Sequence, residues 1–133
     1  MKKFFLIFFF QITSLFGREI TIEQLTLLDI CKMQKTSNQR AECYYEGLDS
    51  LKSFDRPEGT LLSICNKIGS FFYDDRDDEA ASRVEYLCIR HQIALLPYSD
   101  NHSKTMWTCE KVLANTESHF SAVQCISERL RNH

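Results

Sequence analysis

Apolar residues recur at helical spacing in six places along the chain. In each place they stand three or four positions apart, which gathers them on one face of a helix. Strict alternation of apolar and polar residues is rare, so the pattern predicts no substantial β-sheet. The six apolar stripes fall near residues 22–31, 43–54, 61–72, 80–91, 106–113 and 120–130.

Two segments rich in turn-forming residues interrupt this pattern. The first holds Pro57 and Gly59, and the second begins at Pro97 and continues through polar residues. Proline and glycine favour turns over regular helix. The sequence therefore predicts an all-α protein with about six short helices in three antiparallel hairpins. The hairpins are expected near residues 20–55, 59–96 and 102–132.

The first 17 residues have the composition of a secretory signal peptide. Lys2 and Lys3 give a positive start, residues 4–10 are almost all apolar, and a mixed stretch ends at Gly17. The apolar run is shorter than the ~20 residues that a membrane-spanning helix needs. We therefore expect a signal peptide at 1–17 and a secreted, extracellular protein in which residues 18–133 form a single domain without a membrane span.

Six cysteines, all beyond the expected signal peptide, point to a disulfide framework. Disulfides persist in secreted domains, and an even number of cysteines fits complete pairing. Zinc binding is the competing interpretation, but the chain has no C-x-x-C or H-x-x-x-H pair. The cysteines are Cys31, Cys43, Cys65, Cys88, Cys109 and Cys125.

The spacing of the cysteines favours one pairing. In an antiparallel hairpin, residues at equal distances from the turn face each other. The midpoints of the first, second and third cysteine pairs fall at Ser37, at residues 76–77 and at Glu117, each within a polar, turn-like stretch. Six cysteines allow many other connectivities, which the spacing does not exclude. The predicted bridges are Cys31–Cys43, Cys65–Cys88 and Cys109–Cys125.

The charge of the chain argues against a nucleic-acid partner. The chain has 16 basic and 18 acidic residues, and cleavage would remove Lys2 and Lys3. The secreted form would then carry a net charge of about −4, whereas nucleic-acid-binding domains usually present a basic stripe.

The charged run at residues 74–79 is the only stretch that resembles a metal site. Asp74, Asp78 and Glu85 match the first, fifth and last positions of a calcium loop, but Arg76 takes a ligand position. The glycine that such a loop needs is also missing. Acidic residues here are better explained as the start of a helix, whose N-terminus favours negative charge. We therefore predict no metal ion and no other cofactor.

No catalytic constellation is evident in the sequence. None of the four histidines has a recognised catalytic or metal-ligand spacing. Complete cysteine pairing would leave no thiolate nucleophile, and the chain has neither G-x-S-x-G nor a phosphate-binding glycine loop. We therefore expect a protein that is not an enzyme. The histidines are His91, His102, His119 and His133.

One modification site follows from a short motif. Asn101, His102 and Ser103 form an N-glycosylation sequon in the loop expected after Pro97. A secreted chain would meet the glycosylation machinery, and a loop would expose the acceptor. We therefore expect a glycan on Asn101.

These expectations together favour a secreted, non-enzymatic binding or interaction protein. Its partner would be another extracellular protein. The alternative is an extracellular carrier of small hydrophobic ligands, such as lipids or odorants, held in a cavity between helices. The sequence predicts neither the specific partner nor the oligomeric state.

Overall fold

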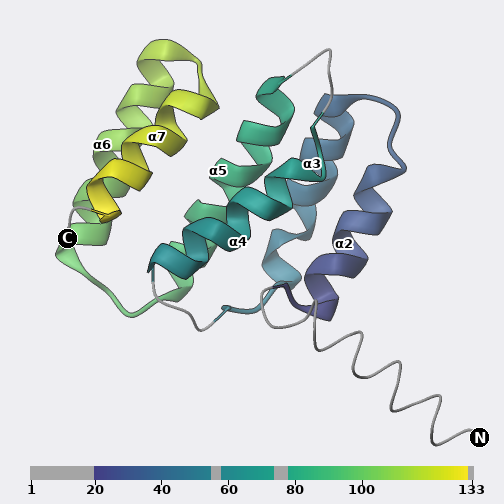
Figure 1. Ribbon diagram of the computed structural model, residues 1–133, viewed down its shortest axis with the longest axis horizontal. Coiled ribbons are helices and arrows are strands. Elements are labelled where there is room, and N and C mark those ends of the chain that lie inside the picture. The colour runs from purple at the N-terminus through teal and green to yellow at the C-terminus, as the bar shows by residue number, and fades with distance from the viewer. Residues whose placement is uncertain (1–19, 55–57, 74–77, 132–133) are drawn as a thin grey trace, which may run out of the picture.

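The computed structural model describes residues 20–54, 58–73 and 78–131, and this part of the chain contains helices and no strands (Figure 1). The predicted all-α class with six helices is confirmed. The expected signal peptide lies outside the described residues. In chain order the elements are α2 (Ile22–Lys32), α3 (Ser37–Gly47), the 3₁₀ helix η1 (Leu48–Ser50), α4 (Glu58–Ser70), α5 (Asp78–Leu95), α6 (Asp100–Thr116) and α7 (His119–Arg131).

The helices form three antiparallel hairpins, α2–α3, α4–α5 and α6–α7, which stand side by side (Figure 1). The C-termini of α2, α4 and α6 and the N-termini of α3, α5 and α7 lie toward one end of the molecule, which we call the turn end (Figure 1). The other ends of these helices lie toward the opposite end.

Each hairpin is closed by one disulfide, and the predicted pairing is confirmed. The Cα atoms of the paired cysteines lie 5.4 Å, 5.5 Å and 5.6 Å apart, within the usual range for a disulfide. No described cysteine is left free. The bridges are Cys31–Cys43, Cys65–Cys88 and Cys109–Cys125.

Polar side chains mark where the helices begin. Thr36 and Gln39 form a reciprocal capping box, which fixes the start of α3 at Ser37. Ser99 caps α6 by accepting a hydrogen bond from the backbone N of His102. Because of this cap, α6 begins at Asp100, two residues before the predicted start of the third hairpin.

Helix α5 lies at the centre of the molecule. It packs against α4 within its own hairpin, against α3 of the first hairpin and against α7 of the third (Figure 1). Val84, Cys88 and Ile89 on this helix are fully buried. The three hairpins therefore share one continuous core, built around α5.

Two buried glutamines, absent from the predicted apolar stripes, link parts of the chain: Gln92 links α5 to the segment after η1, and Gln24 links α2 to α3. Gln92 on α5 accepts a hydrogen bond from the backbone N of Phe54 (2.8 Å) and donates one to the carbonyl of Lys52 (3.1 Å). Gln24 on α2 accepts a hydrogen bond from the hydroxyl of Tyr44 (3.2 Å). Both glutamines are buried, and each satisfies a polar group that would otherwise be costly to bury.

Two residues assigned to the core from the sequence are exposed instead. Ile22 precedes Cys31 by nine residues, or two and a half helical turns, so it faces away from the buried cysteine and is 62% exposed. Phe120 stands two positions before the buried Ala122, more than half a turn away, and is 56% exposed. Spacing of three or four residues from one apolar residue to the next therefore did not keep either side chain on the buried face.

Within residues 20–54, 58–73 and 78–131, no helix has both the length and the apolar composition needed to span a membrane.

Candidate binding groove

Two neighbouring hollows lie between α4, α5 and α7, and both open to solvent. Their volumes are about 540 Å³ and about 490 Å³, and they share the lining residues Asn66, Glu85 and Phe120. Because they share these lining residues, we name the two hollows together the α4–α7 groove. The residues that define the groove in this text are Asn66, Gly69, Ala81, Glu85, Phe120 and Val123.

Two features form the groove. Helix α4 approaches α5 closely, and several residues that line the groove have small side chains. A Cβ atom on Gly69 would lie 2.7 Å from the carbonyl oxygen of Ala81, so only glycine fits this crossing without a shift. Ser70 and Ser82 line the same hollow, and Ser127 on α7 lines the other. Short side chains on three helices therefore leave space above α5.

Glu85 occupies the middle of the groove. Its side chain is half-buried, and its Oε2 accepts a hydrogen bond from Nδ2 of Asn66 on α4 (3.1 Å). Burial raises the pKa of this carboxyl above its ordinary value, and the Asn66 hydrogen bond offsets part of the rise. Among the described residues no cationic group pairs with Glu85.

Phe120 forms an apolar wall shared by the two hollows. It belongs to the first turn of α7, and more than half of its side chain is exposed. An aromatic ring exposed beside a hollow offers a large contact area at little cost in side-chain entropy. Asn66, Glu85 and Phe120 thus bring an amide, a carboxylate and an aromatic ring to one place.

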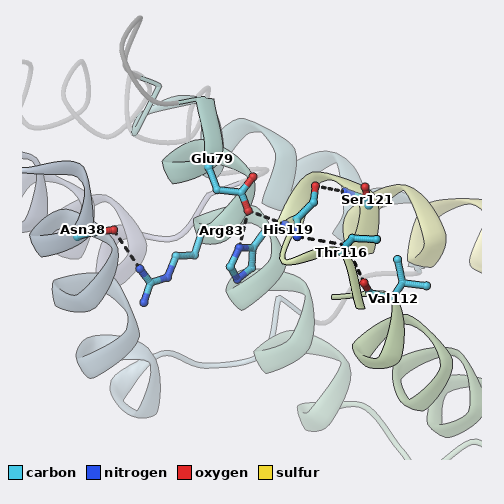
Figure 2. A network of polar contacts seen from close by, with 8 residues as sticks. Asn38, Glu79, Arg83, Val112, Thr116, His119 and Ser121 are labelled. Atoms are coloured by element: carbon cyan, nitrogen blue, oxygen red, sulfur yellow. Dashed lines mark hydrogen bonds and ion pairs between the residues drawn. The ribbon is translucent and has the colours of Figure 1, made fainter. Parts of the chain in front are cut away.

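A polar network supports one end of the groove (Figure 2). Oε1 of Glu79 on α5 accepts a hydrogen bond from the backbone N of His119 (2.5 Å) and lies 2.6 Å from Nδ1 of the same residue. The carboxylate therefore caps the N-terminus of α7, where negative charge is favoured. Nearby, Nη1 of Arg83 donates to Oδ1 of Asn38 on α3 (3.3 Å). These contacts join all three hairpins at the turn end.

The network changes one interpretation of the sequence. The acidic run was explained as the start of the helix that follows it, and α5 does begin at Asp78. Glu79, however, directs its carboxylate at the neighbouring helix α7 (Figure 2). Asp74 and Arg76 lie outside the described residues, so the calcium loop considered for residues 74–85 lies partly outside them too. No cluster of metal-binding side chains occurs within the described ranges.

The other predicted site residues are scattered. Asn101 lies in the first turn of α6 and is half-buried, so its expected position in a loop was wrong. The cause is the Ser99 cap, which starts the helix before the sequon. The Nε2 of His91 lies within hydrogen-bonding distance of the carbonyl oxygen of Leu51 (3.1 Å). His119 belongs to the network at the turn end. His133 lies outside the described residues.

A third hollow lies at the opposite end, between the end of α5 and the start of α6. Its volume is about 340 Å³, and Ile93, Leu96 and Met106 supply much of its apolar wall. Tyr98 stands at its edge and donates a hydrogen bond to Asp100 (2.9 Å). This hollow is smaller than either part of the α4–α7 groove and also opens to solvent.

Sequence reasoning did not identify the α4–α7 groove. The sequence suggested Glu85 only as the last ligand of an incomplete calcium loop, and it placed Phe120 in the core. It gave no sign that Asn66 belongs to a binding site. One usable signal was present, because Phe120 does not share the face defined by Ala122 and Ile126. The positions of α4 and α7 across α5 carry no comparable signal in the sequence.

Comparison with known proteins adds no relative. No family model, no curated protein and no solved structure matches this chain.

Proposed function

We propose that this protein is a secreted, non-enzymatic binding protein that holds a segment of another extracellular protein in the α4–α7 groove. The three disulfides are consistent with an extracellular location. The residues of the groove supply hydrogen-bonding and apolar contacts suited to recognition.

The observation that carries the proposal is the exposed Phe120, which lines both neighbouring hollows. Aromatic side chains that project beside a pocket often dominate the energy of protein–protein contacts. The two hollows, at about 540 Å³ and about 490 Å³, are each as large as a typical site for a whole small molecule. A chain-like ligand is long enough to occupy both.

The alternative, a carrier of small hydrophobic ligands, calls for an enclosed apolar cavity. The three hollows described above open to solvent, and carboxyl and amide groups line the two larger ones. A polypeptide segment suits such walls better than a lipid, because it brings polar backbone groups of its own.

The proposal is tested by selecting peptides from a random twelve-residue phage-displayed library on the full chain, secreted from a eukaryotic host. The selected peptides are then measured against Phe120→Ser and against the control Tyr45→Ser. Tyr45 is a matched control because it is 58% exposed, lies on α3 and lines neither hollow.

We expect peptides whose binding is lost in Phe120→Ser and kept in Tyr45→Ser. A library that yields no Phe120-dependent peptide would contradict the proposal. Native mass spectrometry of the same secreted protein addresses the alternative, because co-purified lipid would favour the carrier.

A further inference from the structure

We infer that the α4–α7 groove recognises a basic side chain, lysine or arginine, on its polypeptide partner, with Glu85 as the counter-ion. This inference rests on the proposed function and specifies the chemistry of the partner. It is argued from the contacts of Glu85, the charge of the groove walls and the position of Phe120.

Glu85 has hydrogen-bonding capacity that the described residues do not use. Oε2 accepts the hydrogen bond from Asn66, and no other described group bonds the carboxylate. A carboxylate that is partly removed from water is unfavourable unless a cation or several donors compensate it. Asn66 supplies one neutral donor, so the second oxygen of Glu85 can accept a hydrogen bond from a ligand.

The charge of the groove walls complements a cation. Carboxylates in the lining are Glu79, Glu85 and Glu128, and the one basic side chain in the lining is Arg131. Glu79 is already paired with His119, and Arg131 lines only the hollow that lacks Glu79. An acidic wall attracts basic segments and disfavours acidic ones.

Phe120 is placed to accept the rest of such a side chain. It lines both hollows together with Glu85, so a ligand in either hollow lies near the ring and the carboxylate. The methylene stem of lysine or arginine packs on an apolar surface while its charged end reaches a polar group. A cation also gains from the face of an aromatic ring.

A free small amine fits the groove less well than a polypeptide. One side chain would occupy only part of the space, which is about 540 Å³ in one hollow and about 490 Å³ in the other. A polypeptide places one basic residue at Glu85 and adjacent residues along α4 and α7. The occupant is therefore a basic segment of a protein.

The test uses the random twelve-residue phage library on the full secreted chain and on two variants, Glu85→Gln and Glu42→Gln. Glutamine keeps the shape of the side chain and can still accept the bond from Asn66, while the charge is lost. Glu42 is the control because it is exposed on α3 and lines neither hollow. Near-ultraviolet circular dichroism checks that each variant keeps its tertiary packing.

We expect the Phe120-dependent peptides to be enriched in lysine or arginine at one position. Their affinity should fall roughly tenfold in Glu85→Gln, the scale for one charge-assisted hydrogen bond. It should stay within about twofold in Glu42→Gln, because exposed charges contribute little.

Four outcomes would overturn the inference, and they separate it from the proposed function. Phe120-dependent peptides without a basic preference, or peptides insensitive to Glu85→Gln, remove the basic partner and leave the groove as a binding site. Equal losses in the two glutamine variants indicate long-range charge and remove the specific role of Glu85. Absence of any Phe120-dependent peptide removes both proposals together.

Discussion

Helices α5 and α6 have almost the same length, 18 and 17 residues, yet they differ greatly in burial. On α6 only Thr105 and Cys109 are buried. On α5 the buried side chains extend over nearly the whole helix. They are Ala80, Val84, Tyr86, Leu87, Cys88, Ile89, Gln92 and Ile93.

The difference comes from position in the molecule. Helix α5 has α4, α3 and α7 around it, whereas α6 packs mainly on α7 at one side (Figure 1). A helix with one main neighbour buries one narrow face, so apolar packing contributes less to its stability. We therefore expect the disulfide Cys109–Cys125 to contribute more to the stability of α6 in the fold than Cys65–Cys88 contributes to that of α5.

The largest effect should follow from reducing all three disulfides. Each bridge stabilises by about 3 kcal/mol in the chain-entropy model, and a whole domain is stable by only about 5–15 kcal/mol. We expect cooperative loss of helix by circular dichroism. Helical content that is unchanged after complete reduction would contradict this expectation.

Removing single bridges sharpens the comparison of α5 and α6. Replacing Cys109 and Cys125 with alanine should make the amides of α6 exchange rapidly while those of α5 stay protected. Replacing Cys65 and Cys88 with alanine should lower protection across the core. Hydrogen exchange by mass spectrometry distinguishes these patterns, and equal loss in α5 and α6 from both variants would argue against the proposed difference.

A core substitution on each helix gives the next largest effect. Ile89→Ala on α5 removes a fully buried side chain and should lower the free energy of unfolding by about 3 kcal/mol. Leu113→Ala on α6 removes a partly buried one and should cost about 1 kcal/mol. Urea denaturation measures both, and equal losses would show that α6 is as well packed as α5.

The sequence was sufficient for the hairpins because their determinants are local. Helical periodicity, the turns at Pro57 and Pro97, and equal spacing of cysteines about three polar stretches are all short-range features. The spacing favoured one pairing among several, and the structure confirms it, as the Cys65–Cys88 bridge illustrates.

The arrangement of the hairpins was not predictable in the same way. Apolar periodicity gives a buried face for each helix, but it does not say which helix is central. The errors at Ile22 and Phe120 have a different cause, because each residue stands off the face that the buried residues of its own helix define. The groove around Glu85 depends on the spacing of α4 and α7 across α5, which is a tertiary property.

A smaller effect concerns the interior face of α6. The hydroxyl of Thr105 is buried and has no hydrogen-bond partner among the described residues. Thr105→Val keeps the shape and removes this group, so it should raise the free energy of unfolding by about 1 kcal/mol. Thr116→Val is the control, because its hydroxyl donates to the carbonyl of Val112 (2.7 Å) and accepts from the backbone N of Ser118 (3.2 Å).

Thermal or urea unfolding measures both threonine variants. The control should be neutral or destabilised by up to about 1 kcal/mol, the scale of a typical hydrogen bond. Destabilisation of Thr105→Val would indicate that the buried hydroxyl has a partner. Thr105 would then no longer count as an unsatisfied polar group on the buried face of α6.

The smallest effect concerns two carboxylates, Glu85 on α5 and Glu110 on α6. Replacing Glu85 should change how the free energy of unfolding depends on pH. Burial raises the pKa of Glu85, so folding favours its neutral form. The stabilising effect of protonation is fully present below the ordinary pKa of glutamate. It is lost as the pH rises from there through the raised pKa of the folded state.

Glu85→Gln carries no charge at any pH and should therefore be more stable than the wild type at neutral pH, by less than about 1 kcal/mol after solvent screening. The difference should shrink in acid. Glu110→Gln on α6 removes an exposed ion pair with Arg90 (3.6 Å) and should change stability slightly in the opposite direction.

Urea unfolding at a series of pH values measures both variants. If Glu85→Gln is less stable than the wild type at neutral pH, partial burial of the Glu85 carboxylate does not destabilise the folded protein. The basic partner inferred for Glu85 then loses one of its supports.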